Sequence, residues 1–184
     1  MSKRLVLALA SVLCALVVAA PVQAKTGTER IVGGHATLTR SAQVTAFLRS
    51  RGITVTPLGA AKGGSGSLTM PMVGGQMQVP TMQGTMVTGG GVEYSKGSRH
   101  VELRDFKLVH AGQTAKLTAI LRGHRILIGT MVAPTTHMSG NTGTMTGGLE
   151  LSAAFAHLIN HLVGMHVVQA GEDLGDLSAT MKMG

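Results

Sequence analysis

A strand with one buried face is written most plainly in Ala115-Lys116-Leu117-Thr118-Ala119-Ile120-Leu121. Ala115, Leu117, Ala119 and Leu121 recur at every second residue, and Lys116 and Thr118 fall between them. Because successive side chains of a β-strand point to opposite faces, this period of two predicts a strand that packs one side against a core.

Working outward, Val101-Glu102-Leu103-Arg104-Asp105-Phe106-Lys107-Leu108 also alternates, but its apolar phase slips by one residue near Arg104-Asp105. A slip of this kind indicates a β-bulge. Gly74-Gly75 is typical of a tight hairpin turn, and Gly89-Gly90-Gly91 is typical of a turn or loop between two strands. Further strands are expected at 53–56, 68–72, 77–79, 83–87, 92–94, 126–131, 165–168 and 177–181.

Two short helices interrupt this pattern, one over 41–51 and one over 152–163. Ser41 and Ser152 are suitable N-caps, and Gly52 and Gly164 are suitable stops. The two units resemble each other after their capping serines, since Val44 corresponds to Phe155 and Leu48 to Ile159. An internal duplication and an independent use of the same helix–turn–strand arrangement both explain the likeness. The fold class expected is mainly β, a β-sandwich or flattened barrel with two short α-helices.

Residues 1–24 are typical of a secretory signal peptide. Lys3 and Arg4 precede an apolar run from Leu5 to Ala20, and Val22-Gln23-Ala24 places small residues where signal peptidase cleaves. An uncleaved N-terminal anchor is the alternative. The expected organisation is a signal peptide at 1–24, a flexible tail at 25–35 and one β-rich domain at 36–184, with no membrane span after cleavage.

Composition excludes several classes of site. The one cysteine, Cys14, lies in the leader, so disulfides, thiolate haem ligation and Cys-zinc sites are excluded from the exported part. The chain carries a net charge of +8, but Lys and Arg are scattered and only one Tyr, three Phe and no Trp are present, which argues against nucleic-acid binding. No catalytic motif is found, so the protein is expected not to be an enzyme.

Three stretches in the middle of the chain carry a family resemblance: Leu68-Thr69-Met70-Pro71-Met72-Val73-Gly74-Gly75-Gln76, Gly84-Thr85-Met86-Val87-Thr88-Gly89-Gly90-Gly91-Val92-Glu93-Tyr94 and Val101-Glu102-Leu103-Arg104-Asp105-Phe106. They are similar to the secreted HtaA-type domain, the haem-transport-associated domain of Gram-positive bacteria. The closing segments Leu149–Ala154 and Ala170–Ser178 resemble the same family's last helix and strand. The resemblance covers about residues 36–181, mostly at Gly and apolar positions.

The resemblance implies a protein that binds haem at the cell surface and passes it on. The family's ligating Tyr follows a Phe-x-x pattern in the first helix, where this chain reads Phe47-Leu48-Arg49-Ser50, so Ser50 stands at the ligand position. The family's His is displaced as well, to His100. From the residues themselves, Tyr94 and His100 are the haem candidates, because a phenolate can ligate ferric haem while a nearby His hydrogen-bonds to it.

Two sets of residues are candidate metal ligands. Met70 and Met72, with Met77, Met82, Met86 and His137-Met138, offer soft thioethers to Cu(I), although core packing explains the same residues. His157 and His161 are four residues apart on the second helix, a chelating spacing, although a pair of half-exposed histidines without a metal is the more usual explanation.

The sequence therefore favours an exported, secreted or cell-surface binding protein whose ligand is haem or another apolar molecule. A structural or adhesive envelope protein without a small ligand, whose partner is a cell-envelope component, is the first alternative. A Cu(I)-binding protein that uses Met and His is the second alternative.

Overall fold

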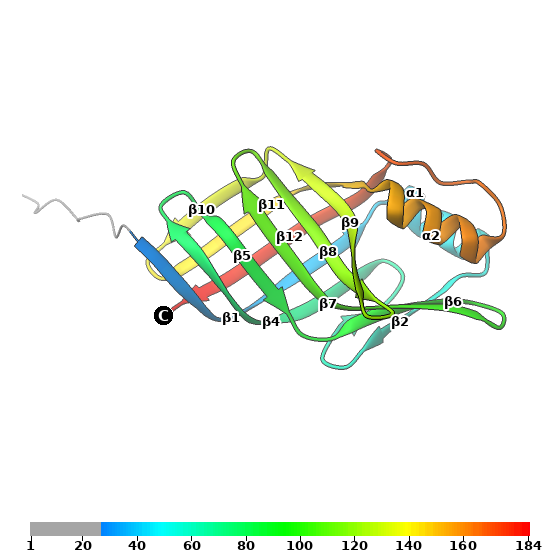
Figure 1. Ribbon diagram of the computed structural model, residues 1–184, viewed down its shortest axis with the longest axis horizontal. Coiled ribbons are helices and arrows are strands. Elements are labelled where there is room, and N and C mark those ends of the chain that lie inside the picture. The colour runs from blue at the N-terminus through cyan, green and yellow to red at the C-terminus, as the bar shows by residue number, and fades with distance from the viewer. Residues whose placement is uncertain (1–26) are drawn as a thin grey trace, which may run out of the picture.

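The computed structural model describes residues 27–184, and the expected signal peptide lies outside the described residues (Figure 1). The elements, in chain order, are β1 (Gly27–Arg40), α1 (Ala42–Ser50), β2 (Thr54–Leu58), β3 (Lys62–Gly63), β4 (Ser67–Val79), β5 (Gln83–Thr88), β6 (Gly91–Lys96), β7 (Arg99–Ala111), β8 (Thr114–Leu121), β9 (His124–Val132), β10 (Thr135–Ser139), β11 (Thr142–Leu151), α2 (Ala153–Val163) and β12 (Asp173–Met183).

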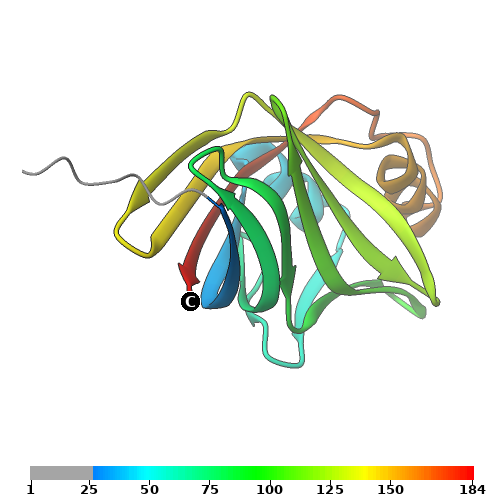
Figure 2. The same ribbon diagram turned by 60° about the vertical axis from the view of Figure 1, so that its left-hand side comes forward.

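Eight antiparallel strands close into a barrel. Their order around the ring is β1, β4, β5, β7, β8, β9, β11 and β12, and β12 returns to β1. The four remaining strands extend the ring: β6 pairs with β7, β2 with β6, β3 with β4 and β10 with β11. The expected mainly β fold with two helices is confirmed, in the barrel form and not as a sandwich (Figure 2).

β7 joins the barrel to an extension beside it. Its first half pairs with β6, from Lys96↔Arg99 to Gly91↔Arg104, and its second half pairs with β5. Between the halves the register with β8 shifts between Arg104 and Lys107, and Asp105 has a φ of 50°. The bulge expected from the phase slip at Arg104-Asp105 is confirmed. It lets one strand serve both parts of the molecule.

Both helices begin and end as expected. The Oγ atoms of Ser41 and Ser152 accept hydrogen bonds from the backbone N–H groups of Val44 and Phe155, at 3.3 and 3.1 Å. Gly52 and Gly164 take positive φ values of 64° and 85° just after the helices, where other residues would be strained. α1 and α2 lie together at one end of the molecule, next to β6 (Figure 1). Neither helix of Gly27–Gly184 is long and apolar enough to cross a membrane.

Three local expectations are wrong, each at a glycine or at a short apolar run. Gly27 to His35 is not a tail but the first part of β1, with Ile31 buried in the core and Gly34 so close to Thr180 that a Cβ would collide with its carbonyl oxygen. Gly74-Gly75 lies inside β4, directly after a register shift between Met72 and Gly74, and the chain turns only after Val79. Residues 165–168 form no strand.

Asn160 explains the irregular conformation of 165–168. Its Oδ1 accepts hydrogen bonds from the backbone N–H groups of Val167 and Val168 at 2.9 and 3.0 Å, and its Nδ2 donates to the carbonyl oxygen of Val168 at 2.8 Å. A side chain of α2 therefore satisfies the backbone groups that a neighbouring strand would otherwise satisfy.

Methionine fills much of the core. Within residues 27–184, nine methionines are buried to 6% exposure or less: Met70, Met72, Met77, Met82, Met86, Met131, Met145, Met181 and Met183. Flexible thioether side chains suit the irregular space inside a barrel that holds few aromatic residues. Met70 and Met72, the Cu(I) candidates, are core residues, and the Met70 sulfur accepts a hydrogen bond from Thr88 at 3.7 Å.

This packing predicts the cost of emptying one methionine site. We expect Met145→Ala to lower the free energy of unfolding by about 2–5 kcal/mol, because the lost side chain leaves a cavity in a closed barrel. Met165→Ala is the matched control and should change it by no more than about 0.5 kcal/mol, since Met165 is 47% exposed. Urea unfolding of the two variants measures the difference, and equal costs would contradict a methionine-filled core.

Candidate functional site

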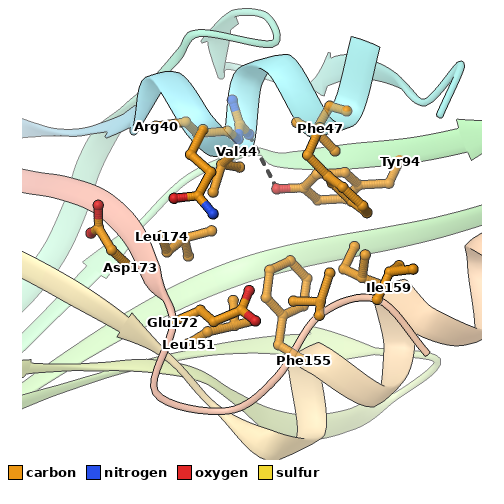
Figure 3. A pocket seen from close by; sticks show the side chains of 14 residues that line it. Arg40, Val44, Phe47, Tyr94, Leu151, Phe155, Ile159, Glu172, Asp173 and Leu174 are labelled. Carbon is orange, nitrogen blue, oxygen red and sulfur yellow. Dashed lines mark hydrogen bonds between the residues drawn. The ribbon is translucent and has the colours of Figure 1, made fainter. Parts of the chain in front are cut away.

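A cavity of about 210 Å³ lies between α1 and α2. α1 forms one wall with Val44, Phe47 and Leu48, and α2 forms the facing wall with Phe155 and Ile159 (Figure 3). Polar side chains of Arg40, Tyr94, Glu172 and Asp173 also line it. The cavity is thus an apolar slot between two helices with a small number of charged and hydroxyl groups around it.

The similarity between the two helical units explains this slot. Val44 and Phe155 occupy the third position after their capping serines, and Leu48 and Ile159 the seventh. Val44 and Leu48 therefore share one face of α1, and Phe155 and Ile159 share one face of α2. All four side chains line the cavity. Two helices with the same cap and the same apolar stripe therefore face each other, whatever the origin of their likeness.

Most of the chain's aromatic side chains gather here. The sequence has one Tyr, three Phe and no Trp, and three of these four, Phe47, Tyr94 and Phe155, line the cavity. The Tyr94 and Phe155 rings lie edge to face, with their centroids 5.8 Å apart. Aromatic walls offer a large, stiff apolar surface to a flat ligand.

Tyr94 comes from β6, and its hydroxyl meets Arg40, the last residue of β1. The Arg40 Nη2 donates a hydrogen bond to the Tyr94 Oη at 3.1 Å, and the Arg40 guanidinium carbon lies 5.7 Å from the centroid of the Tyr94 ring (Figure 3). Arg40 Nη1 donates to the carbonyl oxygens of Gly64 and Ser65 at 2.6 and 3.0 Å. The arginine thus connects three segments: β1, β6 and the loop between β3 and β4.

Several contacts hold the cavity walls in place. Gly175 of β12 lies so close to β1 that a Cβ would collide with the Thr39 carbonyl oxygen, and this approach brings Leu174 beside α1, where its carbonyl oxygen accepts from Ser41 N at 3.3 Å. At the end of α2, Lys96 Nζ donates to the Val163 carbonyl oxygen and Arg99 Nη1 to that of His161. A cation at a helix C-terminus also interacts favourably with the helix dipole.

The acidic side chains at the cavity accept hydrogen bonds from the backbone of the α2–β12 loop and of the start of β12. Glu172 Oε1 accepts a hydrogen bond from the backbone N–H of Gln169 at 3.0 Å, and Asp173 Oδ1 accepts one from Gly175 at 2.9 Å. Neither forms an ion pair with Arg40, although all three line the same space.

The structure separates the two haem candidates, Tyr94 and His100. In the β6–β7 register Tyr94 is opposite Val101 and Ser95 is opposite His100, so the side chains of Tyr94 and His100 lie on opposite faces of the sheet. Tyr94 is 4% exposed and lines the cavity, whereas His100 is exposed. The residue that hydrogen-bonds to the Tyr94 hydroxyl is therefore Arg40 and not His100.

Sequence reasoning missed Arg40. One signal was available, because Arg40 directly precedes the N-cap Ser41, and a cation near a helix N-terminus is unfavourable unless something else fixes it there. Ser50, at the position where the sequence resemblance implied a ligating Tyr, is exposed, and its hydroxyl donates to the Phe47 carbonyl oxygen within α1.

His157 and His161 are exposed on the outer side of α2, away from the cavity. They line a shallow groove with Arg99 and His166. Within Gly27–Gly184 no group of three or more His, Cys, Asp or Glu side chains is arranged to hold a metal ion. Metal binding by His157 and His161 stays a prediction, limited to a two-imidazole chelate beside a guanidinium.

The Arg40–Tyr94 contact has a measurable cost if broken. We expect Tyr94→Phe to lower the free energy of unfolding by about 1–3 kcal/mol, because it leaves a buried N–H of Arg40 without its acceptor while keeping the ring. His100→Ala, at an exposed position, should change it by no more than about 0.5 kcal/mol. Urea unfolding compares the two, and a larger effect of His100→Ala would contradict the pairing.

Comparison with known proteins finds similarity in structure and not in sequence. No family model matches the chain, and no curated protein matches it. The C-terminal domain of HtaA from Corynebacterium glutamicum superposes with a TM-score of 0.71 at 13% identity, covering 85% of this chain and 99% of that domain.

Two further solved structures give the same result. The N-terminal domain of HtaA superposes with a TM-score of 0.62 at 15% identity, covering 82% of this chain and 97% of that domain. The heme-binding protein HtaB of the same organism gives 0.55 at 13% identity, covering 87% of this chain and 98% of HtaB. The resemblance read from the Gly and apolar positions is confirmed at the level of structure: this chain has the fold of the HtaA-type domains.

Proposed function

We propose that this protein binds a flat, largely apolar molecule in the cavity between α1 and α2, and that haem is the first candidate. The observation that carries the proposal is the gathering of Phe47, Tyr94 and Phe155 in one cavity of a chain that has only four aromatic residues. Aromatic rings placed around a slot favour stacking and edge contacts with a conjugated ring system.

The fold supports the choice of haem among flat ligands. HtaB, which shares the fold, is described as a heme-binding protein. With identities of 13–15% to the solved structures, ligand contacts are not carried over residue by residue. The contact that we propose in this chain is Tyr94, held by Arg40 at the cavity wall.

Cavity size sets the form of binding. A cavity of about 210 Å³ is below the range of about 300–1,000 Å³ common for the pockets of drug-sized ligands. It is therefore too small to hold a whole porphyrin. A porphyrin would therefore be enclosed only in part, with one edge between the helices, unless α1 and α2 separate. Binding rather than catalysis is the proposed role.

The proposed location is outside the cytoplasm, secreted or at the cell surface. This part of the proposal rests on the signal peptide expected at residues 1–24 and on the domain beginning after it. A purely structural or adhesive role in the envelope is the outcome if the cavity takes no ligand. The described residues 27–184 do not favour Cu(I), because Met70 and Met72 lie in the core.

A cavity-filling variant tests the site directly. We expect haem titration of the exported protein to shift the Soret band, and Val44→Trp to weaken binding by at least about tenfold, or 1.4 kcal/mol, because the indole occupies the slot. Ala46→Trp, on the exposed side of the same helix, is the matched control and should bind as the parent does.

Absorbance spectroscopy follows both variants, and circular dichroism checks that both fold. The absence of a spectral shift at micromolar haem would overturn haem as the ligand. Equal weakening by both tryptophans would move the binding site away from this cavity.

A further inference from the structure

Arg40 is the one charged side chain buried in the described part of the chain. Three polar residues of Gly27–Gly184 are buried, Arg40, Thr88 and His110, at 4%, 6% and 5% exposure. Thr88 is neutral and hydrogen-bonds to Met70 and to the Phe106 carbonyl oxygen, and the His110 Nδ1 lies 2.6 Å from the Met82 carbonyl oxygen. Only Arg40 brings a permanent charge into the interior.

The hydrogen bonds of Arg40 hold its position but leave its charge without a partner. A guanidinium has five N–H groups. Two on Nη1 donate to the carbonyl oxygens of Gly64 and Ser65, and one on Nη2 donates to Tyr94 Oη. Nε is buried and has no partner in the described structure. These acceptors, two backbone carbonyl oxygens and a phenol, carry no charge. Arg40 forms no ion pair with any described residue.

Nearby carboxylates do not supply the missing charge. Glu172 and Asp173 line the same cavity but accept hydrogen bonds from Gln169 and Gly175, and neither lies within 4.0 Å of the guanidinium nitrogens. The Nε of Arg51 is also buried without a partner. Arg51 differs from Arg40 in that its side chain is partly exposed and does not line the cavity.

An unpaired buried cation is costly. Charged side chains are seldom buried without an opposite charge, because the loss of hydration is recovered only by a close anion. Here the carbonyl oxygens and the phenol fix the guanidinium at the wall of a cavity, so a ligand that brings an anion gains an interaction that water no longer supplies. A carboxylate suits this group best, since its two oxygens match adjacent guanidinium N–H groups.

Tyr94 adds a second donor at the same place. Its Oη accepts the hydrogen bond from Arg40, so its own O–H is available to an acceptor in the cavity. Arg40 and Tyr94 together form a cationic, hydrogen-bond-donating end of a slot whose other walls are Val44, Phe155 and Ile159. Such a slot fits an amphipathic acid, with its ring or chain between the helices.

We propose that the ligand of this cavity is an apolar carboxylic acid whose carboxylate pairs with Arg40 and accepts from Tyr94. The inference rests on the proposed function, which places the ligand between α1 and α2, and it adds the ligand's charge and orientation. If haem is the ligand, a propionate enters first and the iron is not required.

Acid and ester pairs test the inference on the unaltered protein. We compare haem, metal-free protoporphyrin IX and protoporphyrin IX dimethyl ester, and, as a pair without a porphyrin, cis-parinaric acid and its methyl ester. Each acid should bind at least about tenfold more tightly than its ester, because only the acid supplies an anion for Arg40. Metal-free protoporphyrin IX should bind about as tightly as haem. Fluorescence and absorbance titrations give the affinities.

Variants locate the effect. Arg40→Met should reduce the difference between acid and ester to less than about twofold, and Arg40→Lys should restore part of it, since a charge is kept. Arg49→Met, which removes an exposed charge from α1, should leave the difference unchanged. Because Arg40 also holds the loop at Gly64 and Ser65, Tyr94→Phe serves as a second variant, with a smaller reduction expected.

The outcomes separate the two proposals. Equal binding of acids and esters, or binding of haem but not of metal-free protoporphyrin IX, would overturn the inference, the latter in favour of an iron contact at Tyr94. Failure of all the acids to bind would overturn it as well. If parinaric acid binds over its ester while haem does not bind, haem is excluded and the inference stands.

Discussion

The bulge between Arg104 and Lys107 is the constraint on which the two parts of this molecule depend. Before it, β7 pairs with β6, and after it, β7 pairs with β5 inside the barrel. One strand therefore closes the barrel and also carries the sheet extension from which Tyr94 faces the helices. The backbone N–H of Asp105 donates to the Gly90 carbonyl oxygen, which joins the bulge to the break between β5 and β6.

The barrel and the helices use their residues differently. The barrel is filled by flexible side chains, nine of them methionines buried to 6% exposure or less. The cavity between the helices gathers the stiff aromatic rings of Phe47, Tyr94 and Phe155 instead. Methionine adapts to the space that closure leaves, whereas a site for a flat ligand requires surfaces that keep their shape.

Arg40 links stability with binding. Its guanidinium joins three separate segments through Gly64, Ser65 and Tyr94, so the protein keeps a buried charge that its own acids do not neutralise. Natural proteins that depart from complete internal pairing tend to do so at functional sites. The same residue that fixes the wall of the cavity is thus the one that selects a ligand of opposite charge in the proposal above.

The solved HtaA and HtaB structures share this fold at only 13–15% identity. In this chain the architecture depends on the alternation of apolar residues, on the bulge and on glycines at close approaches such as Gly34 and Gly175. These positions determine backbone shape and pairing, and they leave the chemistry of the cavity free to vary. Ser50, the position at which the sequence resemblance implied a ligating Tyr, is exposed on α1 in this chain.

The sequence by itself determined the local elements: the period-two strands, the bulge at Arg104-Asp105 and the two helices with their serine caps and glycine stops. These features depend on contacts between residues a few positions apart, which local spacing records. Only the tertiary structure decided that the sheet closes as a barrel, that Gly34 and Gly75 lie within strands, and that Arg40 meets Tyr94 across 54 residues of chain while His100 faces away. Periodicity shows which face of a strand is apolar, but the partner of each strand depends on how distant segments share one core.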